Sequence, residues 1–315
     1  MQRIRGAEGL APGQRGASAA LGNFDGVHLG HQQLIRVARA ALPDAPLGVI
    51  TFEPHPRRYF QPEAPAFRLT TANERARVLA RLGVERLHEL AFDRALATTE
   101  AEEFIERVLV RGLGIRHVVI GEDFRFGRGR RGDAALMRRK GPELGFGVTI
   151  HPLVPGPEHT YASTAIRALI EQGRVGDAAA ALGRWHTVSG RVEVGDRRGR
   201  ELGYPTANLS FGEQIEPRHG VYAAEVTVHD GPHAGRHGGV ASIGVRPQFG
   251  ANTPNFEVHL FDFSGDLYGA EISAGLVSFL RDEARFESVE ALIAQMDADS
   301  AAARAALAHA HEPEG

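Results

Sequence analysis

One segment near the start of the chain decides the fold of its first half: Gly22-Asn23-Phe24-Asp25-Gly26-Val27-His28-Leu29-Gly30-His31. It follows a short apolar run and leads into helical spacing, so it predicts a strand, a turn and a helix. Its glycines let phosphate oxygens approach the backbone, and the start of the helix presents N–H groups to an anion. His28 and His31 are three residues apart and share one face if the helix begins near Gly30. Imidazoles so placed can donate hydrogen bonds to charge that develops on a phosphate during transfer. The alternative is a strand-turn-helix corner that carries two surface histidines.

The rest of the first half alternates short apolar runs with helical patterns. Capping boxes at Thr71 with Glu74 and at Thr99 with Glu102 predict two helix starts, and a helical stretch closes the region over residues 163–182. This alternation implies crossover connections and a parallel sheet, which binds ligands at the carboxyl ends of its strands. The strands are predicted at residues 17–21, 47–52, 86–90, 117–121 and 147–151.

Three further segments carry polar groups at the predicted ligand-binding edge. Prolines on both sides of His55 restrict its backbone and fix the direction of its imidazole. The segment 121–127 offers an acid, aromatic rings and the first of several arginines; the alternative for these arginines is a mobile, solvated basic loop. The hydroxyls of Ser163 and Thr164 can bind phosphate or cap the last helix, whereas Arg167 is less easily explained by capping.

The pattern changes after Gly183. Runs at 221–228, 239–245 and 255–263 have strand-like composition and are separated by Gly, Pro, Asn and His turns, which predicts an antiparallel barrel or sandwich. An Ala-rich segment at about 288–309 predicts one closing helix. We therefore place a domain boundary at residues 183–184.

The second half also carries phosphate chemistry. Thr206 and Asn208 supply hard oxygen ligands two residues apart, on one face of an extended segment, and suit Mg²⁺ that carries nucleotide phosphates. Glu257 is the candidate that accepts a proton from an acceptor hydroxyl. Taken singly, each has an ordinary alternative: a turn former for Thr206 or Asn208, and a solvated strand residue for Glu257.

Composition limits the classes of function. A length of 315 residues suggests about two domains, at roughly 100–200 residues each. The formal net charge of -3 gives no overall attraction to nucleic acid or an anionic membrane, so anion binding must come from local arrangement. Lys140 is the only lysine, no phosphate-loop motif occurs, and the lack of cysteine excludes disulfides and zinc–thiolate sites. Without a signal-like start or an apolar stretch of about 20 residues, we expect a soluble, cytoplasmic protein.

The first half resembles the nucleotidyltransferase superfamily through its His-x-Gly-His element. Its Thr-Phe-Glu-Pro-His-Pro and Asp-Phe-Arg-Phe-Gly segments resemble the adenylyltransferase half of bacterial bifunctional riboflavin kinase/FAD synthetases. The resemblance implies a Rossmann-like domain over residues 1–183 that transfers AMP from ATP to FMN, with Mg²⁺ neutralising ATP. It implies catalysis by His28 and His31, ATP and phosphate binding by Gly22, Phe24, Asp25, Gly30, His55, Ser163, Thr164 and Arg167, and FMN binding by Asn23, Asp123, Phe124 and Arg125.

The second half resembles riboflavin kinase, whose Gly-Tyr-Pro-Thr-Ala-Asn-Leu string is matched without gaps at 203–209. The resemblance implies a six-stranded antiparallel barrel over residues 184–315, with a closing C-terminal helix, that phosphorylates the terminal ribityl hydroxyl of riboflavin. Ser242 and Gln248 stand where the riboflavin kinase family usually has Asn and Thr. In the helix-start element of the first half, Ala162 stands where a second Ser is usual. The implied roles are catalysis by Glu257, phosphate binding by Gly195, Arg200, Gly203 and Thr206, Mg²⁺ binding by Thr206 and Asn208, and flavin binding by Arg285 and Phe286.

Together these expectations describe an enzyme that makes FMN and then FAD, with one ATP at each step. Its partners are riboflavin, FMN and ATP, with FMN and FAD as products or ligands, and neither nucleic acid nor a membrane is expected. Two alternatives stay open: a nucleotidyltransferase with a different acceptor, and a flavin-binding module that has lost turnover. Nucleic-acid binding by the arginines of residues 125–131 is disfavoured because the cluster is confined to one loop. The oligomeric state is not predicted.

Overall fold

The computed structural model describes residues 1–156, 161–195, 203–245 and 254–313. The chain packs into two compact units. The first unit comprises Met1–Ala64 and Arg75–Ala162, and the second comprises Pro65–Glu74 and Ser163–Gly315. By packing, the second unit thus begins before the predicted boundary at residues 183–184, which stays a prediction about where one activity ends and the other begins.

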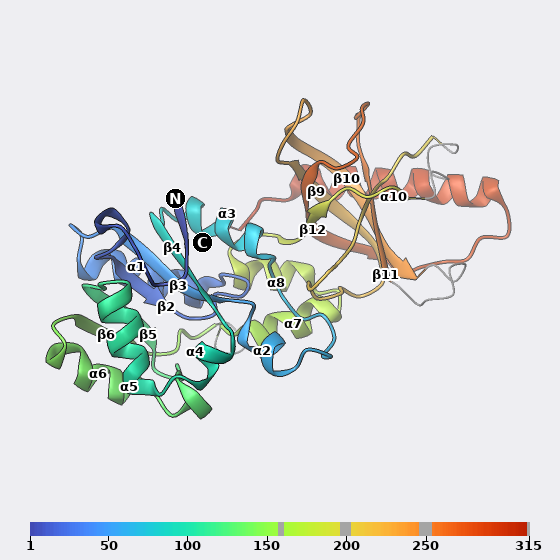
Figure 1. Ribbon diagram of the computed structural model, residues 1–315. Coiled ribbons are helices and arrows are strands. Elements are labelled where there is room, and N and C mark those ends of the chain that lie inside the picture. Colours follow the sequence, from blue (N-terminus) through green and yellow to red (C-terminus); the bar gives the residue numbers. More distant parts are fainter. Residues whose placement is uncertain (157–160, 196–202, 246–253, 314–315) are drawn as a thin grey trace. The chain divides into compact units, whose positions relative to one another are not determined.

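The first unit is built on a six-stranded parallel sheet (Figure 1). All five predicted strands begin and end within one residue of their expected bounds, and two of them, β5 and β6, match those bounds. The strand β1 was not predicted because its sequence buries a single apolar residue, Ile4, at the edge of the sheet. In spatial order the strands are β1 (Gln2–Arg5), β4 (Arg86–Ala91), β3 (Leu47–Glu53), β2 (Ser18–Leu21), β5 (His117–Gly121) and β6 (Gly147–His151).

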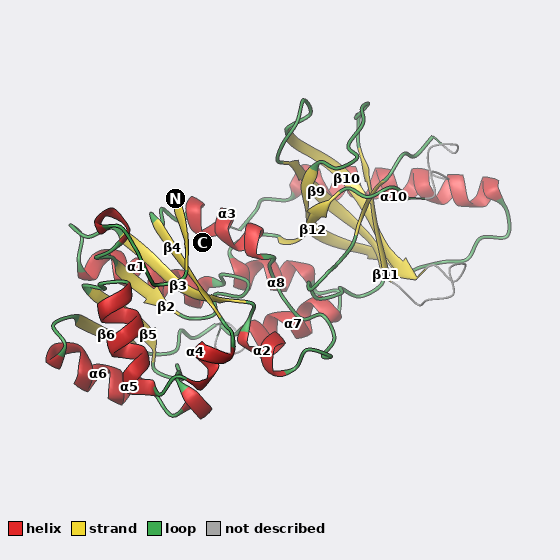
Figure 2. Ribbon diagram, viewed as in Figure 1, coloured by secondary structure: helices red, strands yellow, loops and turns green. Residues whose placement is uncertain are grey.

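Helices cover both faces of this sheet (Figure 2), so its central strands are apolar on both sides. One face packs against α1 (Leu29–Ala41) and α3 (Ala72–Arg81), and the other packs against η2 (Phe104–Gly112) and α6 (Ala134–Glu143). The connections also contain η1 (Pro12–Gln14), α2 (Pro56–Phe60), α4 (Arg94–Thr98), α5 (Ala101–Glu103), which runs into the π-helical η2, and η3 (Arg128–Arg130).

One of the two predicted capping boxes is confirmed in its main contact. The backbone N–H of Glu74 donates to the Thr71 hydroxyl at 3.1 Å, immediately before α3. The prediction for Thr99 was wrong: its hydroxyl donates back to the Ala95 carbonyl at 2.7 Å, and Glu100 precedes α5 without a side-chain cap. The Thr99 hydroxyl therefore bonds to the short helix that ends at Thr98, whereas the sequence spacing predicted that it would cap the next helix.

Strand order places the loops that carry the candidate residues together. β2 lies between β3 and β5, so the connections that leave β2 and β5 run to opposite sides of the sheet. Neighbouring parallel strands that diverge in this way leave a crevice at their carboxyl ends. Since Ala20 pairs with Val119, the loops that begin at Gly22 and at Glu122 start beside each other at this crevice.

The second unit contains a six-stranded antiparallel sheet that curls on itself. A bridge between Glu193 and Asn208 joins the continuation of the first strand in spatial order to the last, which makes the predicted barrel. Runs predicted at 221–228, 239–245 and 255–263 correspond to β9, β10 and β11. In spatial order the strands are β7 (His186–Arg191), β12 (Glu271–Arg281), β9 (Gly220–Val228), β10 (Gly235–Val245), β11 (Pro254–Leu260) and β8 (Ala207–Leu209).

Helices complete the second unit. The predicted closing helix is α10 (Val289–His309), whose Ala303 and Leu307 pack against Phe261 and Val277 of the barrel. The stretch predicted as one helix over 163–182 is two, α7 (Ser163–Glu171) and α8 (Val175–Leu182). Gly173 between them has a φ of 76°, a left-handed conformation that ends α7. Along the described parts of the chain, we find no helix with the length and apolar character needed to cross a bilayer.

Each unit encloses a histidine inside its apolar interior. His88 in the middle of β4 is 0% exposed, and burial together with the charge of Arg86 lowers its pKa to about 4. Burial and the charge of Arg184 lower the pKa of His186 to about 3. Both rings are therefore neutral in the folded protein at pH values where the unfolded chain protonates them. The contribution of these neutral rings to folding stability is fully present above the pKa of the unfolded chain. It is lost as the pH falls below that value.

We expect His88 to account for a measurable part of this acid sensitivity. The pKa of His88 is near 6.5 in the unfolded chain and about 4 in the folded protein. This difference lowers the free energy of unfolding by about 2 kcal/mol when the pH falls from about 7.5 to about 5. His88→Leu removes this loss, which denaturant unfolding at the two pH values measures. Replacement of the exposed His311 by Ala serves as the control and leaves the loss unchanged. An equal pH dependence in His88→Leu and the parent contradicts the prediction.

Candidate functional site

The loop between β2 and α1 has a strained backbone. Phe24 and Val27 have φ values of 50° and 44°, which are unusual for residues with large or branched side chains, and both are fully buried. The Thr51 hydroxyl of β3 donates to the Asn23 carbonyl at 2.9 Å and holds the loop to the sheet. Strain that the surrounding packing maintains is typical of binding and catalytic loops.

The two predicted imidazoles meet at the first turn of α1. His28 caps the helix, since its Nδ1 accepts the backbone N–H of His31 at 3.4 Å. The two rings stack with their centroids 3.7 Å apart. A Cβ on Gly30 would lie 3.1 Å from the His28 ring, so glycine at this position leaves room for the imidazole. Burial, as the larger cause, and the electrostatic interaction with His28, as the smaller, hold the pKa of His31 well below its usual value, so His31 is neutral at physiological pH.

His55 is held in the same way as His28. It lies at the start of α2, and its Nδ1 accepts the backbone N–H of Arg57 at 3.1 Å. A neutral imidazole that accepts at Nδ1 carries its proton on Nε2. The backbone thus fixes both His28 and His55 in the tautomer that donates from Nε2. A donor oriented before the ligand arrives is the kind of group that stabilises charge on a phosphate.

The loop after β5 is folded back on itself. Phe126 pairs with Gly132 through backbone hydrogen bonds of 2.9 and 3.1 Å, and a Cβ on Gly132 would collide with the Phe126 ring. Phe124 stacks on Phe126, while Asp123 and Arg125 are exposed. Arg125 pairs with Asp133 at 3.1 Å. The loop therefore has a defined packing, and the alternative of a solvated basic surface applies to Arg128, Arg130 and Arg131, which are exposed.

Sequence reasoning missed a cluster of aromatic rings beside His55. Tyr59 and Phe60 of α2 and Phe92 after β4 contact one another edge to face, with centroids 5.1 to 5.7 Å apart. Phe60 is 64% exposed. Clustered aromatic surface open to solvent suits a flat ring or another apolar partner. The signal available in the sequence was the pair of aromatics four and five residues after His55.

The residues predicted to grip phosphate from a helix start lie on α7, in the second unit. Ser163 is half-buried and Thr164 is exposed. Arg167 donates from Nε to the Phe67 carbonyl at 2.7 Å, and its guanidinium lies 5.5 Å from the centre of the Phe67 ring. Arg167 thus has a structural contact that fastens the segment around residue 67 to α7.

The second unit brings the predicted kinase residues together. Asn208 and Glu257 are direct partners across β8 and β11. The Thr206 hydroxyl donates to Glu257 Oε2 at 2.9 Å, and the Asn255 amide donates to Glu257 Oε1 at 2.6 Å. Both oxygens of the carboxylate are therefore oriented by neighbours. Ser242, one of the two departures from the family pattern in this half, is the partner of Glu257 on the other side, on β10.

Glycine at one of the predicted phosphate-binding positions leaves room for the side chain of Asn208. A Cβ on Gly195 would lie 2.7 Å from Asn208 Oδ1 and closer still to the rest of that amide. Gly203 has a φ of 84°, in the left-handed region that favours glycine. The predicted phosphate ligand Arg200 and the departure at Gln248 lie outside the described residues.

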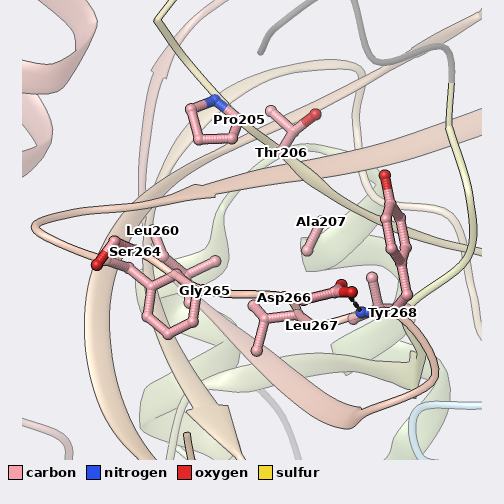
Figure 3. A pocket seen from close by; sticks show the side chains of 11 residues that line it. Pro205, Thr206, Ala207, Leu260, Ser264, Gly265, Asp266, Leu267 and Tyr268 are labelled. Carbon is pink, nitrogen blue, oxygen red and sulfur yellow. Dashed lines mark hydrogen bonds between the residues drawn. The ribbon is translucent and has the colours of Figure 1, made fainter.

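A pocket of about 330 Å³ opens beside Thr206 (Figure 3). Pro205, Thr206 and Ala207 form one wall, and the loop from Phe263 to Tyr268 forms another. Apolar walls with a few polar groups, at this size, are typical of small-molecule sites. The Tyr268 N–H donates to Asp266 Oδ1 at 2.9 Å, which shapes the loop.

The predicted flavin residues of this unit lie between β12 and α10. Arg285 is exposed and Phe286 is half-buried. The guanidinium of Arg281 lies 5.8 Å from the centre of the Phe286 ring and forms a forked ion pair with Asp299 of α10, at 2.7 and 2.8 Å. The closing helix thus anchors the strand end from which this segment leaves.

Both halves of the chain match known protein families. Residues 11–165 match the family described as FAD synthetase, and residues 182–307 match the family described as riboflavin kinase. A bifunctional riboflavin kinase/FMN adenylyltransferase of Pseudomonas fluorescens is 40% identical over 98% of each chain. The protein of the same name from Escherichia coli K12 is 38% identical, over 96% of this chain and 97% of that one.

A solved structure is also similar over nearly the full length. It is titled a macrolide-efflux protein from Streptococcus pneumoniae, and it matches with a TM-score of 0.83 and 32% identity, covering 96% of this chain and 98% of that one. Three findings lead to one conclusion: the sequence identity over the full length, the two families matched one after the other along the chain, and the fold of both units. The chain belongs to the bifunctional riboflavin kinase/FMN adenylyltransferases, which phosphorylate riboflavin to FMN and adenylylate FMN to FAD.

Proposed function

We propose that the two reactions use separate sites, one built on the loops of the first unit and the other on the barrel of the second. The observation that supports this is the placement of the two constellations: the capped imidazoles in the first unit, and Thr206, Asn208 and Glu257 in the second. Each step uses its own ATP. The proposal also places the enzyme in the cytoplasm, where ATP is available.

In the adenylyl transfer, a phosphate oxygen of FMN attacks the α-phosphorus of ATP. The bond to the bridging oxygen breaks, and pyrophosphate leaves with the electron pair. His28 and His55 donate from Nε2 to the phosphates, and His31 acts beside His28. Donors that are already oriented stabilise the growing negative charge without reorganisation. The remaining residues proposed for the phosphate site of the first unit are Gly22, Phe24, Asp25 and Gly30. The phosphate-binding roles of Ser163, Thr164 and Arg167, which lie on α7 in the second unit, stay predictions from the sequence.

The flavin of this reaction binds near the crevice at the carboxyl ends of the strands. Asn23, Asp123, Phe124 and Arg125 belong to loops that leave β2 and β5 at this edge. The cluster of Phe60, which is exposed, with Tyr59 and Phe92, which are half-buried, offers an additional aromatic surface for the isoalloxazine ring.

In the phosphoryl transfer, the terminal ribityl hydroxyl of riboflavin attacks the γ-phosphorus of a second ATP, and ADP leaves. Glu257 accepts the proton of that hydroxyl. Hydrogen bonds from Thr206 and Asn255 hold its carboxylate in one orientation, and such positioning is the main contribution a protein makes to this chemistry. Gly195, Arg200 and Gly203 help to enclose the phosphates, Arg285 and Phe286 contact the flavin, and the pocket beside Thr206 receives the rest of the nucleotide.

The donor set of the second unit fits Mg²⁺. Mg²⁺ in kinases is held by one or two protein oxygens together with phosphates and water. Thr206 and Asn208 supply two such oxygens, and the space that Gly195 leaves admits the Asn208 amide beside them. Among the described residues, no group of three His, Asp or Glu side chains could hold a metal by itself, which agrees with a metal that arrives with its nucleotide. When bound, Mg²⁺ neutralises the phosphate charge.

Separate sites predict opposite losses in two variants. His28→Ala lowers FAD formation from FMN by more than about 100-fold and leaves riboflavin phosphorylation within about twofold, because it removes a charge-stabilising donor. Asn208→Ala gives the reverse pattern. Chromatography of flavins after incubation with Mg²⁺ and ATP measures both products. His28→Asn is the matched control for helix stability, because asparagine keeps a good cap without the imidazole, and it is as defective as His28→Ala. Loss of both activities in either folded variant contradicts separate sites.

The contact between Gly195 and Asn208 predicts a loss confined to the kinase. Gly195→Ala pushes the Asn208 amide away, and we expect the kcat of riboflavin phosphorylation to fall at least about tenfold, with FAD formation from FMN unchanged. Gly176→Ala is the control, because a Cβ at that helical position meets nothing within 4 Å. Wild-type kinase activity in Gly195→Ala shows that the amide is not needed where the structure places it.

A further inference from the structure

A chain of charged side chains runs through the first unit on the face covered by α3. Arg75 of α3 is 0% exposed, and its Nη2 lies 2.8 Å from Glu53 Oε2 and 3.2 Å from Glu89 Oε1. Arg3 of β1 holds the same Glu89 through three hydrogen bonds of 3.0 to 3.1 Å. One buried guanidinium therefore joins the carboxylate of β4 to the carboxylate at the end of β3.

The position of Glu53 gives this network a connection to the chemistry. Glu53 is the last residue of β3 and stands two residues before His55. Its side chain is 31% exposed, whereas that of Glu89 is 4% exposed, so the network emerges from the interior at the loop that carries His55. Fixing the Glu53 carboxylate fixes the end of the strand, and Pro54 alone separates that end from His55.

An ordinary structural role does not explain the arrangement well. A charge pair inside a protein contributes little net stability compared with apolar side chains of the same size. Apolar side chains around Ala76, Val78 and Leu79 already pack α3 to the sheet. The ion pair adds direction instead: hydrogen bonds from the one Nη2 nitrogen to Glu53 and Glu89 hold the two carboxylates relative to each other, which apolar contacts cannot do.

We infer that Arg75 is a positioning residue for adenylyl transfer, which acts through Glu53 to hold the His55 imidazole against the phosphates of ATP. The inference rests on the proposed role of His55. Arg75 does not reach the substrate. Loss of Arg75 therefore shifts the His55 imidazole away from the phosphates without removing it. This reduces the rate of adenylyl transfer more than it reduces the affinity for FMN.

The test compares three substitutions in the full chain with FMN, ATP and Mg²⁺. Arg75→Met removes the charge, Arg75→Lys keeps a charge between the two carboxylates, and Arg3→Met breaks the same network one pair further from His55. We expect the kcat of FAD formation to fall at least about tenfold in Arg75→Met, because small displacements of a catalytic group have effects of this size. Arg75→Lys recovers activity to within about threefold, and Arg3→Met stays within about twofold of the parent. Riboflavin phosphorylation and the melting temperature are recorded for each variant.

Two outcomes overturn the inference. One is a folded Arg75→Met protein with the kcat and KM of the parent. The other is an Arg3→Met protein whose kcat falls as far as that of Arg75→Met, which shows that the network acts through general stability. If Arg75→Met does not fold, Glu53→Gln replaces it: the amide keeps the size and one acceptor of Glu53, and an unchanged kcat again overturns the inference.

His55→Ala separates this inference from the site assignment on which it rests. An inactive His55→Ala protein beside a fully active Glu53→Gln protein rejects the positioning role alone. A fully active His55→Ala protein rejects both the positioning role and the assignment of His55 to the phosphate site.

Discussion

Hydrogen bonds between the proposed reactive groups and the fixed backbone or fixed neighbours are the interactions on which both proposed sites depend. In the first unit, backbone N–H groups of the following helices occupy Nδ1 of His28 and His55 and so fix the tautomer and direction of each ring. In the second, Thr206 and Asn255 fix both oxygens of Glu257. The chain has a net charge of -3, so an overall excess of positive charge cannot attract phosphates to it. Oriented neutral donors at each site therefore have to supply much of the stabilisation of phosphate charge.

The fold makes these orientations possible because regular elements hold the proposed reactive groups: His28 and His55 cap α1 and α2, and Glu257 lies within β11. The loops after β2, β3 and β5 leave the same edge of a sheet whose two faces are sealed by apolar helices. In the barrel, Asn208 and Glu257 are cross-strand partners, so the register of β8 and β11 brings them together. Charges inside this framework are paired, as with Arg75, because an unpaired buried charge costs about 3–5 kcal/mol when its partner is removed.

Much of the fold followed from the sequence, and the exceptions have physical reasons. Strands buried on both faces, such as β3 and β5, are continuous apolar runs and were predicted within one residue. The edge strand β1 is mostly exposed, and β8 has three residues, so neither carries a clear pattern. Gly173 divided a helix whose apolar spacing continues on both sides. Thr99 satisfied the spacing of a capping box, yet the preceding helix took its hydroxyl.

The candidate residues could be identified from their types and spacing, but their geometry could not. Nothing in the sequence shows that His28 and His55 both accept at Nδ1, that Gly195 lies against Asn208, or that Tyr59, Phe60 and Phe92 form one cluster, since each depends on contacts made by folding. The central claim is that two nucleotides bind at two sites. A crystal structure with FMN and a non-hydrolysable ATP analogue in excess with Mg²⁺ tests it most directly. We predict one triphosphate within hydrogen-bond distance of the Nε2 atoms of His28 and His55, and a second whose metal contacts Thr206 and Asn208. A single nucleotide, or triphosphates away from both sets of residues, contradicts the account.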